Sequence, residues 1–283
     1  MWTTAVYDYL FLGVDTLVVG ILYAVYKTRK EIIANIVKAP SATVGPELEK
    51  LLEEHGNNVD YIILKGKVEA LEKPIQSQTG MQGVLQVVTL SEHSVKRHAF
   101  GQWGDDVRTL QKTLNAVPFG LRNLAKSGRE IIVEVKNPLD AEGVNLLMPV
   151  ATNFSPANSN IATAVVDFFT GHASKGFETT EKFLPVDTVV TGIGQVTRDS
   201  SGHIALIEPT QGDMFPYYLS TLPSENIVKR LERTNTYIKI GACLLATVGI
   251  IIAVRRITAW WQIQKLLFWI VDMLPFAQIA PLD

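Results

Sequence analysis

Cysteine is nearly absent from this chain, since Cys243 is the only one in 283 residues. A single thiol forms no intramolecular disulfide and cannot build a thiolate zinc site, so a disulfide-stapled secreted fold is excluded. An excess of charge of one sign is also lacking, because 26 Lys and Arg residues face 28 Asp and Glu residues. The resulting net charge of -2 provides no basic field for nucleic acid, and we expect no nucleic-acid partner.

Sequence motifs that carry common chemistries are missing as well. The chain has no Gly-x-x-x-x-Gly-Lys-Ser/Thr phosphate loop, no Gly-x-Ser-x-Gly elbow and no His-Glu-x-x-His metal motif. His93 and His98 would need help from the acids at 105 and 106 to hold a metal, and surface histidines are the simpler interpretation. We therefore predict no catalytic, cofactor-binding or metal-binding residue in the chain.

Two long apolar runs are present, at Tyr9–Tyr26 and Tyr237–Val254. Each is long enough for a helix to cross about 30 Å of hydrocarbon. No Lys or Arg precedes the first run, and basic residues at 27, 29 and 30 follow it, which favours an uncleaved membrane anchor over a signal peptide. The predicted organisation is an N-terminal transmembrane anchor in 1–30, a middle domain in 40–222, a helix leading into a second transmembrane span in 223–256, and an apolar, interfacial tail in 257–283.

Charged residues inside the apolar segments are rare. Asp15 lies within the first run, where a charge costs about 2.5–3.5 kcal/mol on insertion scales. It is either an intramembrane partner site or a tolerated residue that pairs weakly. In the tail, Lys265 lies in the middle of a Trp-rich apolar stretch, which favours an interfacial helix over a third span.

The middle domain has the mixed pattern of an α+β fold, in which two transmembrane helices flank a strand-rich domain with antiparallel hairpins. Asp199-Ser-Ser-Gly202 between two β-rich runs predicts a hairpin turn, and Gly192-Ile-Gly194 predicts a bulge or a close-packing site. Asn153 begins a glycosylation sequon, which matters only in a secretory lumen. Strands are expected over 60–71, 84–90, 130–136, 186–197, 203–208 and 215–220, and helices over 47–55, 159–169 and 224–236.

Two groups of residues carry a resemblance to a known family. The first comprises Gly83-Val-Leu-Gln-Val-Val-Thr-Leu-Ser-Glu-His93, Gln102-Trp103 and Asn115-Ala-Val-Pro-Phe119. The second comprises Gly171-His-Ala-Ser-Lys175-Gly176, Thr180-Glu181, Thr191-Gly-Ile-Gly194 and Gly212-Asp-Met-Phe-Pro-Tyr217-Tyr218-Leu219-Ser220. In this order, between two spans and over about residues 7–256, they resemble the mitochondrial ubiquitin ligase family known as MULAN, MAPL or GIDE.

The resemblance implies a multi-pass protein of the mitochondrial outer membrane, with both termini in the cytosol and the middle domain in the intermembrane space. It also implies roles in mitochondrial fission, mitophagy and signalling, and a C-terminal RING that binds zinc and transfers ubiquitin or a ubiquitin-like modifier. No cysteine or histidine follows Val254, so the RING ligands have no positions here and no cofactor is expected.

Binding or regulation, including pairing with full-length relatives as a homo- or hetero-oligomer, is then the expected role. A truncated product of a ligase gene and a natural RING-less relative both remain open, as does a secretory-pathway membrane protein with a lumenal domain. The family-like groups offer Trp103, Lys175, Glu181 and Tyr218 as partner-binding residues, with core packing as the alternative for Trp103 and Tyr218.

Overall fold

The structure is a computed structural model of the chain, and it describes residues 2–97, 102–124, 130–144, 146–157, 167 and 170–273. Internal contacts divide the chain into two units. One contains residues up to Ile33 and from Arg230 onward, and the other contains Ala34–Lys229. This division separates most of the two apolar helices from the strand-rich middle of the chain.

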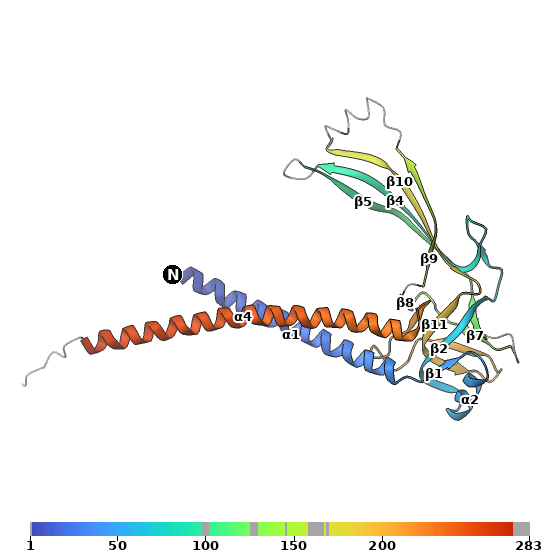
Figure 1. The fold of residues 1–283 in the computed structure, drawn as a ribbon, viewed down its shortest axis with the longest axis horizontal. Coiled ribbons are helices and arrows are strands. Elements are labelled where there is room, and N and C mark those ends of the chain that lie inside the picture. Colours follow the sequence, from blue (N-terminus) through green and yellow to red (C-terminus); the bar gives the residue numbers. More distant parts are fainter. Residues whose placement is uncertain are drawn as a thin grey trace, which may run out of the picture. The chain divides into compact units, whose positions relative to one another are not determined.

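The first unit is built from α1 (Trp2–Lys38) and α4 (Ser224–Met273), drawn in Figure 1. The most apolar 18-residue stretches within Val6–Lys38 and Ser224–Leu266 have mean hydropathies of 1.8 and 2.2, and only 6% of each stretch is buried. Apolar helices with so little protein around them suit a lipid environment. The helix α4 does not end at Val254, so the described part of the tail continues the second span as helix, and its interfacial position stays a prediction.

Five strands of the middle unit close into a barrel. The strand β2 pairs with both β6 and β11, and the circuit is completed by β6–β7, β7–β12 and β12–β11 pairs. Only the β7–β12 pair is parallel, which is the arrangement of an OB-type Greek-key barrel. The barrel strands are β2 (Asn58–Ala70), β6 (Phe119–Arg122), β7 (Ile132–Val135), β11 (Val189–Arg198) and β12 (Ile204–Ile207).

Apolar side chains from all five strands fill the barrel. Val68, Phe119, Val133, Val190 and Leu206 are almost completely buried and belong to one continuous core. The short helix α2 (Pro46–Glu54) adds two fully buried leucines to this core, while β1 (Ser41–Thr43), β8 (Glu142–Val144) and β13 (Tyr218–Ser220) extend the sheet. Burial of this apolar surface is the main favourable term that holds the domain together.

Glycine permits two close approaches in β11. A Cβ added at Gly192 would lie 2.5 Å from Cδ2 of Leu206, and one at Gly194 would lie 2.7 Å from the carbonyl oxygen of Ile207. The pairing of β11 with β2 also shifts register between Gly194 and Val196. The structure therefore confirms both the close packing and the bulge that this glycine pair predicts.

A second, five-stranded antiparallel sheet, here called the arm sheet, extends from the barrel strands (Figure 1). Two excursions of the barrel chain form it together, one between β2 and β6 and one between β7 and β11. The strands lie in the order β5-β4-β10-β9, with β3 paired to one end of β4. They are β3 (Ile75–Gln76), β4 (Gln82–Arg97), β5 (Trp103–Ala116), β9 (Met148–Pro156) and β10 (His172–Pro185).

The predicted α+β class and its antiparallel hairpins are confirmed. Predicted strands at 60–71, 130–136, 186–197 and 203–208 correspond to β2, β7, β11 and β12, and the helix at 47–55 corresponds to α2. The turn at Asp199–Gly202 joins β11 to β12, with the Asp199 amide donating to the His203 carbonyl at 2.8 Å. The predicted helix at 159–169 lies, apart from residue 167, outside the described residues.

Candidate interaction sites

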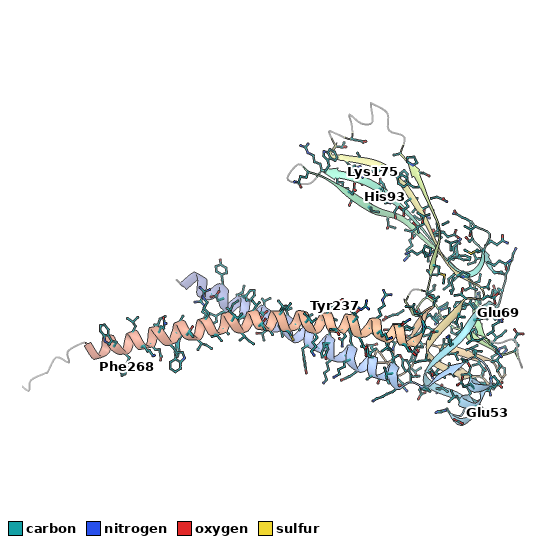
Figure 2. The ribbon with its side chains drawn as sticks, in the orientation of Figure 1. Glu53, Glu69, His93, Lys175, Tyr237 and Phe268 are labelled. Atoms are coloured by element: carbon teal, nitrogen blue, oxygen red, sulfur yellow. The ribbon has the colours of Figure 1, made fainter. Side chains whose placement is uncertain are left out.

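The far end of the arm sheet carries two of the four predicted partner-binding residues at its surface. Trp103 is 42% exposed, and the exposed amine of Lys175 pairs with Asp105 of β5. Strand register places Trp103 and Asp105 on the same sheet face as His93, and the ion pair with Asp105 brings Lys175 to that face, where Figure 2 shows it beside His93. This face is therefore open to contact from another molecule.

The His93 side chain already contacts two neighbouring side chains on that face. Its Nε2 lies 2.9 Å from a carboxylate oxygen of Glu178, and its ring meets Phe154 edge to face, with centroids 5.7 Å apart. No group of three or more His, Cys, Asp or Glu side chains able to hold a metal occurs within the described part of the chain. His98, the other histidine of the considered metal pair, lies outside the described residues.

Glu181, by contrast, is buried, with 1% of its surface exposed. Its carboxylate accepts hydrogen bonds from Gln86 Nε2 at 2.6 Å, from the Ser77 hydroxyl at 3.2 Å and from the Gln78 amide at 3.2 Å. Because charge-assisted hydrogen bonds to a buried carboxylate are strong, this group fastens the β3–β4 turn to β10. Partner binding by Glu181 stays a prediction, and its contacts in this structure are internal.

Tyr218 is also internal, with 4% of its surface exposed. The neighbouring Tyr61 hydroxyl donates to the Pro216 carbonyl at 3.1 Å, and the Tyr61 ring meets Phe215 edge to face. Burial, with a smaller contribution from Tyr218, raises the pKa of Tyr61 above its usual value. Burial likewise raises the pKa of Tyr217, whose hydroxyl donates to the Lys136 carbonyl at 3.0 Å. Tyr61 and Tyr217 are therefore buried hydrogen-bond donors whose hydroxyls stay protonated.

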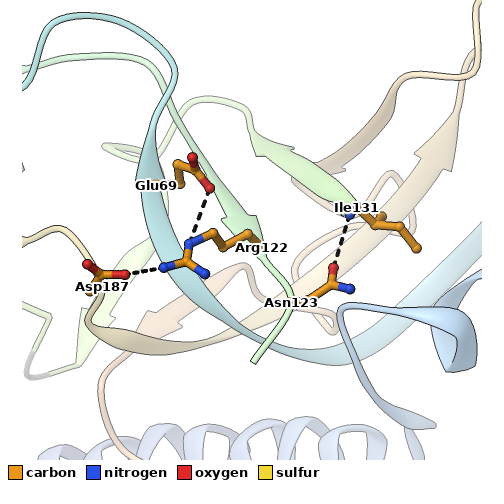
Figure 3. Close-up of polar contacts among 5 residues, drawn as sticks. All are labelled: Glu69, Arg122, Asn123, Ile131 and Asp187. Carbon is orange, nitrogen blue, oxygen red and sulfur yellow. Dashed lines mark hydrogen bonds and ion pairs between the residues drawn. The ribbon is translucent and has the colours of Figure 1, made fainter. Parts of the chain in front are cut away.

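An ion cluster that no sequence pattern indicated joins the barrel to the arm (Figure 3). The Arg122 Nε atom of β6 lies 3.3 Å from Glu69 of β2, and its terminal nitrogen pairs with Asp187 in the β10–β11 turn. Asp187 adopts a left-handed backbone conformation, with φ of 65°. Beside this cluster, the Asn123 side-chain oxygen accepts the Ile131 amide at 3.1 Å. The sequence alone could not predict these contacts, because the partners are far apart in the chain and come from different strands and turns.

In the helical unit, Asp15 faces the other helix. It is 8% exposed, and its Oδ2 lies 2.1 Å from the point where a Cβ on Gly249 would be. Seven residues away on each helix, Asp8 pairs with Arg256. The two contacts fit one antiparallel register of α1 against α4. The acid predicted to be an intramembrane partner site thus meets the second span of its own chain.

Comparison with known proteins gives a consistent assignment. A family model described as GIDE, an E3 ubiquitin ligase, matches residues 88–254, which include most of the arm sheet, the later barrel strands and much of α4. The Drosophila melanogaster protein "Mitochondrial E3 ubiquitin protein ligase 1" is 29% identical over 237 residues, covering 82% of this chain and 67% of that relative. The human protein "Mitochondrial ubiquitin ligase activator of NFKB 1" is 28% identical over 229 residues, covering 80% of this chain and 64% of that relative.

Matches extend to plants, since an E3 ubiquitin-protein ligase of Arabidopsis thaliana is 22% identical over 213 residues, covering 75% of this chain and 59% of that relative. No solved structure matches. The chain spans about two thirds of the length of its animal relatives. The family match therefore covers the later part of the strand-rich domain and much of α4.

Proposed function

This chain belongs to the GIDE family of E3 ubiquitin ligases, and on that premise we propose that it is a regulatory protein of the mitochondrial outer membrane. Its two apolar helices span the membrane, and its middle domain lies in the intermembrane space, where it binds partners. Through them it acts on mitochondrial fission, mitophagy and signalling. The observation that carries this proposal is the family match over residues 88–254, in a chain with two helices long enough to cross a bilayer.

The chemistry of the residues present is compatible with a regulatory role. A RING holds two zinc ions with Cys and His side chains, and this sequence contains one cysteine, at position 243 within α4. Residues 255–283 contain neither cysteine nor histidine. Ubiquitin transfer by these residues alone therefore has no zinc-binding scaffold, whereas binding through the arm sheet needs none. Pairing with full-length relatives would let such a chain control their activity.

The greater length of the relatives favours a second candidate function. Because the human relative extends well beyond the matched region, these residues also suit the membrane-anchoring part of a longer, active ubiquitin ligase. Sequencing the 3′ ends of the transcripts separates the two. Paired Cys-x-x-Cys codons downstream of the Val254 codon would support the second candidate, and their absence from every transcript would support the first.

Activity is tested in a ubiquitin-discharge assay with the chain reconstituted in liposomes. We expect no discharge from a ubiquitin-loaded conjugating enzyme by the chain alone, and a changed rate when a full-length relative shares the liposome. Autonomous ubiquitin transfer by the 283-residue chain would refute the regulatory role. An unchanged rate for the relative would refute pairing between them.

Topology is tested by single-cysteine labelling in mitochondria. In a Cys243→Ser background, a cysteine at Ser201 in the exposed hairpin turn should react with a membrane-impermeant maleimide only after the outer membrane is ruptured. A cysteine at Thr3 should react in intact mitochondria and serves as the matched control. Glycosidase-sensitive mass at Asn153 would instead favour a secretory lumen and overturn the mitochondrial location.

A further inference from the structure

A groove lies where the root of the arm sheet meets the connection between β7 and β9. Its volume is about 490 Å³, within the range of 300–1,000 Å³ that is usual for small-ligand sites. Leu85 and Leu146, which are 2% and 6% exposed, lie at its inner side, and the more exposed Leu114 and Leu139 line its rim. The groove therefore offers a mainly apolar surface with an open side.

Two lysines flank this apolar surface. Strand register sets Lys112 of β5 opposite Thr89 and Lys182 of β10 opposite Val87, so both lie on one face of the arm sheet, on either side of β4. Two strand spacings and an offset of two residues along the strands separate them, about 12 Å between backbones, and both line the groove. Long, flexible amine side chains at this spacing can converge on one anionic group.

Neither lysine has an acidic partner among the residues that the structure describes. Asp140 and Glu142 belong to the same connection, but they alternate with the lining residues Leu139, Ala141 and Gly143 and form no ion pair with either lysine. Other arm lysines differ, since Lys175 is paired with Asp105. Two unpaired amines beside clustered leucines indicate a ligand with an anionic head and an apolar body.

We propose that this groove binds one long-chain fatty acid, with its acyl chain along Leu85, Leu114 and Leu146 and its carboxylate between Lys112 and Lys182. The volume suits one chain better than the two chains of a membrane phospholipid. Two candidate spans tether the domain to a bilayer, so free fatty acids that partition there are present at a high local concentration. Binding requires no metal and no catalysis, and it is independent of any ubiquitin transfer.

Photo-cross-linking of the full chain in phosphatidylcholine nanodiscs tests the proposal. The probe is hexadecanoic acid carrying a diazirine near its methyl end, and labelled peptides are mapped by mass spectrometry. We expect labelling of the peptides that contain Leu114 and Leu139, with competition by unlabelled hexadecanoate. Hexadecanol, which lacks the charge, and inorganic phosphate, which lacks the chain, should each compete at least about tenfold less well.

Substitutions sharpen the test. The double variant Lys112→Gln, Lys182→Gln should lower groove labelling about tenfold, whereas Lys73→Gln, at an exposed position outside the groove, should not change it. Gly143→Leu should fill the groove and also lower labelling, because a Cβ there has no neighbour closer than 3.6 Å and the fold can accept it. Unchanged unfolding temperatures of these variants exclude loss of fold as the cause.

Several results would overturn the proposal. Labelling confined to α1 and α4 would show that the probe reacts only with lipid-facing helices and does not enter the groove. Equal competition by hexadecanol would refute recognition of the carboxylate, and stronger competition by diacyl phosphatidic acid would refute the single-chain ligand. Wild-type labelling of the double lysine variant would exclude the lysines from binding.

Discussion

Replacing Gly249 with valine should weaken the contact between the two apolar helices. A Cβ at this position would lie 2.1 Å from Oδ2 and 3.2 Å from Cγ of Asp15, well inside the normal contact distance. Asp15 is 8% exposed, so rotating its carboxylate aside moves it against other buried atoms or into lipid. Overpacking of this kind costs about 1–3 kcal/mol in well-packed interiors.

The expected loss is smaller within a membrane than in a soluble core. Polar contacts between transmembrane helices contribute about 0.6 kcal/mol on average, and the Asp8–Arg256 pair still holds the helices at a second point. We therefore expect Gly249→Val to cost about 1–2 kcal/mol, which corresponds to a fivefold to thirtyfold change in the population of the closed helix pair. The chain should still insert, because valine favours the bilayer.

Disulfide cross-linking measures this population. In a Cys243→Ser background, cysteines at Leu12 and Ile252 lie between the two helix contacts, and both positions are half-buried. The initial rate of copper-catalysed cross-linking in nanodiscs should fall at least about fivefold in Gly249→Val. The matched control is Gly241→Val on the same helix, where an added Cβ meets nothing within 4 Å, and it should leave the rate unchanged.

A suppressor variant tests whether the clash with Asp15 causes the loss of cross-linking. Asp15→Ala combined with Gly249→Val removes the clashing carboxylate and should restore cross-linking to within about twofold of the parent. An unchanged rate in Gly249→Val, or an equal loss in Gly241→Val, would refute the close contact. Failure of the suppressor would show that valine clashes with something other than Asp15.

Three further predictions concern the middle domain, each measured by chemical unfolding of the chain in detergent. Glu181→Ala should lower the free energy of unfolding by about 3 kcal/mol, since the buried Gln86 and Ser77 side chains and the part-buried Gln78 amide all lose the acceptor that they share; exposed Glu72→Ala is the control, and equal losses would refute the network. Gly192→Ala should cost about 1–3 kcal/mol through its clash with Leu206, whereas Gly143→Ala, with no neighbour closer than 3.6 Å, should be nearly neutral. Stability should fall as pH rises above about 10, because raised pKa values keep Tyr61 and Tyr217 protonated in the folded state while the unfolded tyrosines ionise, at most about 1.4 kcal/mol per pH unit for each. Tyr217→Phe should reduce that alkaline slope, and an unchanged slope would contradict the assignment.

Four of the five barrel strands could be predicted because burial shapes their sequence, whereas the short β6 could not. The strands β2, β7, β11 and β12 place apolar side chains into one core, so their segments are rich in Val and Ile and end at turn residues. Closure of the barrel could not be predicted in the same way. The parallel β7–β12 pair joins Val133 to Ile204 across the second arm excursion, and periodicity contains no information on such distant pairing.

Among the arm strands only part of β4 was predicted, at 84–90, and the others escaped prediction for the opposite reason. Nearly all of β5 is exposed, so polar residues occupy both of its faces and the alternation that reveals a half-buried strand is absent. Much of β10 is also polar, and Glu181 is buried there because Gln86, Ser77 and Gln78 satisfy its carboxylate. A buried acid with internal partners has the same sequence signature as an exposed one. The ion cluster around Arg122 was hidden by the same long-range pairing.

The four residues proposed for partner binding fall into two physical classes, and substitution should separate them. Trp103 and Lys175 are exposed on the arm, so Trp103→Ala and Lys175→Ala should change the free energy of unfolding by no more than about 0.5 kcal/mol. Tyr218 and Glu181 are buried, so alanine at either position should destabilise the domain before it reveals anything about binding. Chemical cross-linking in isolated mitochondria then measures partner capture. If a partner uses the arm, Trp103→Ala should reduce its cross-linked yield at unchanged stability, whereas a yield that falls only in the destabilised variants would assign all four residues to folding alone.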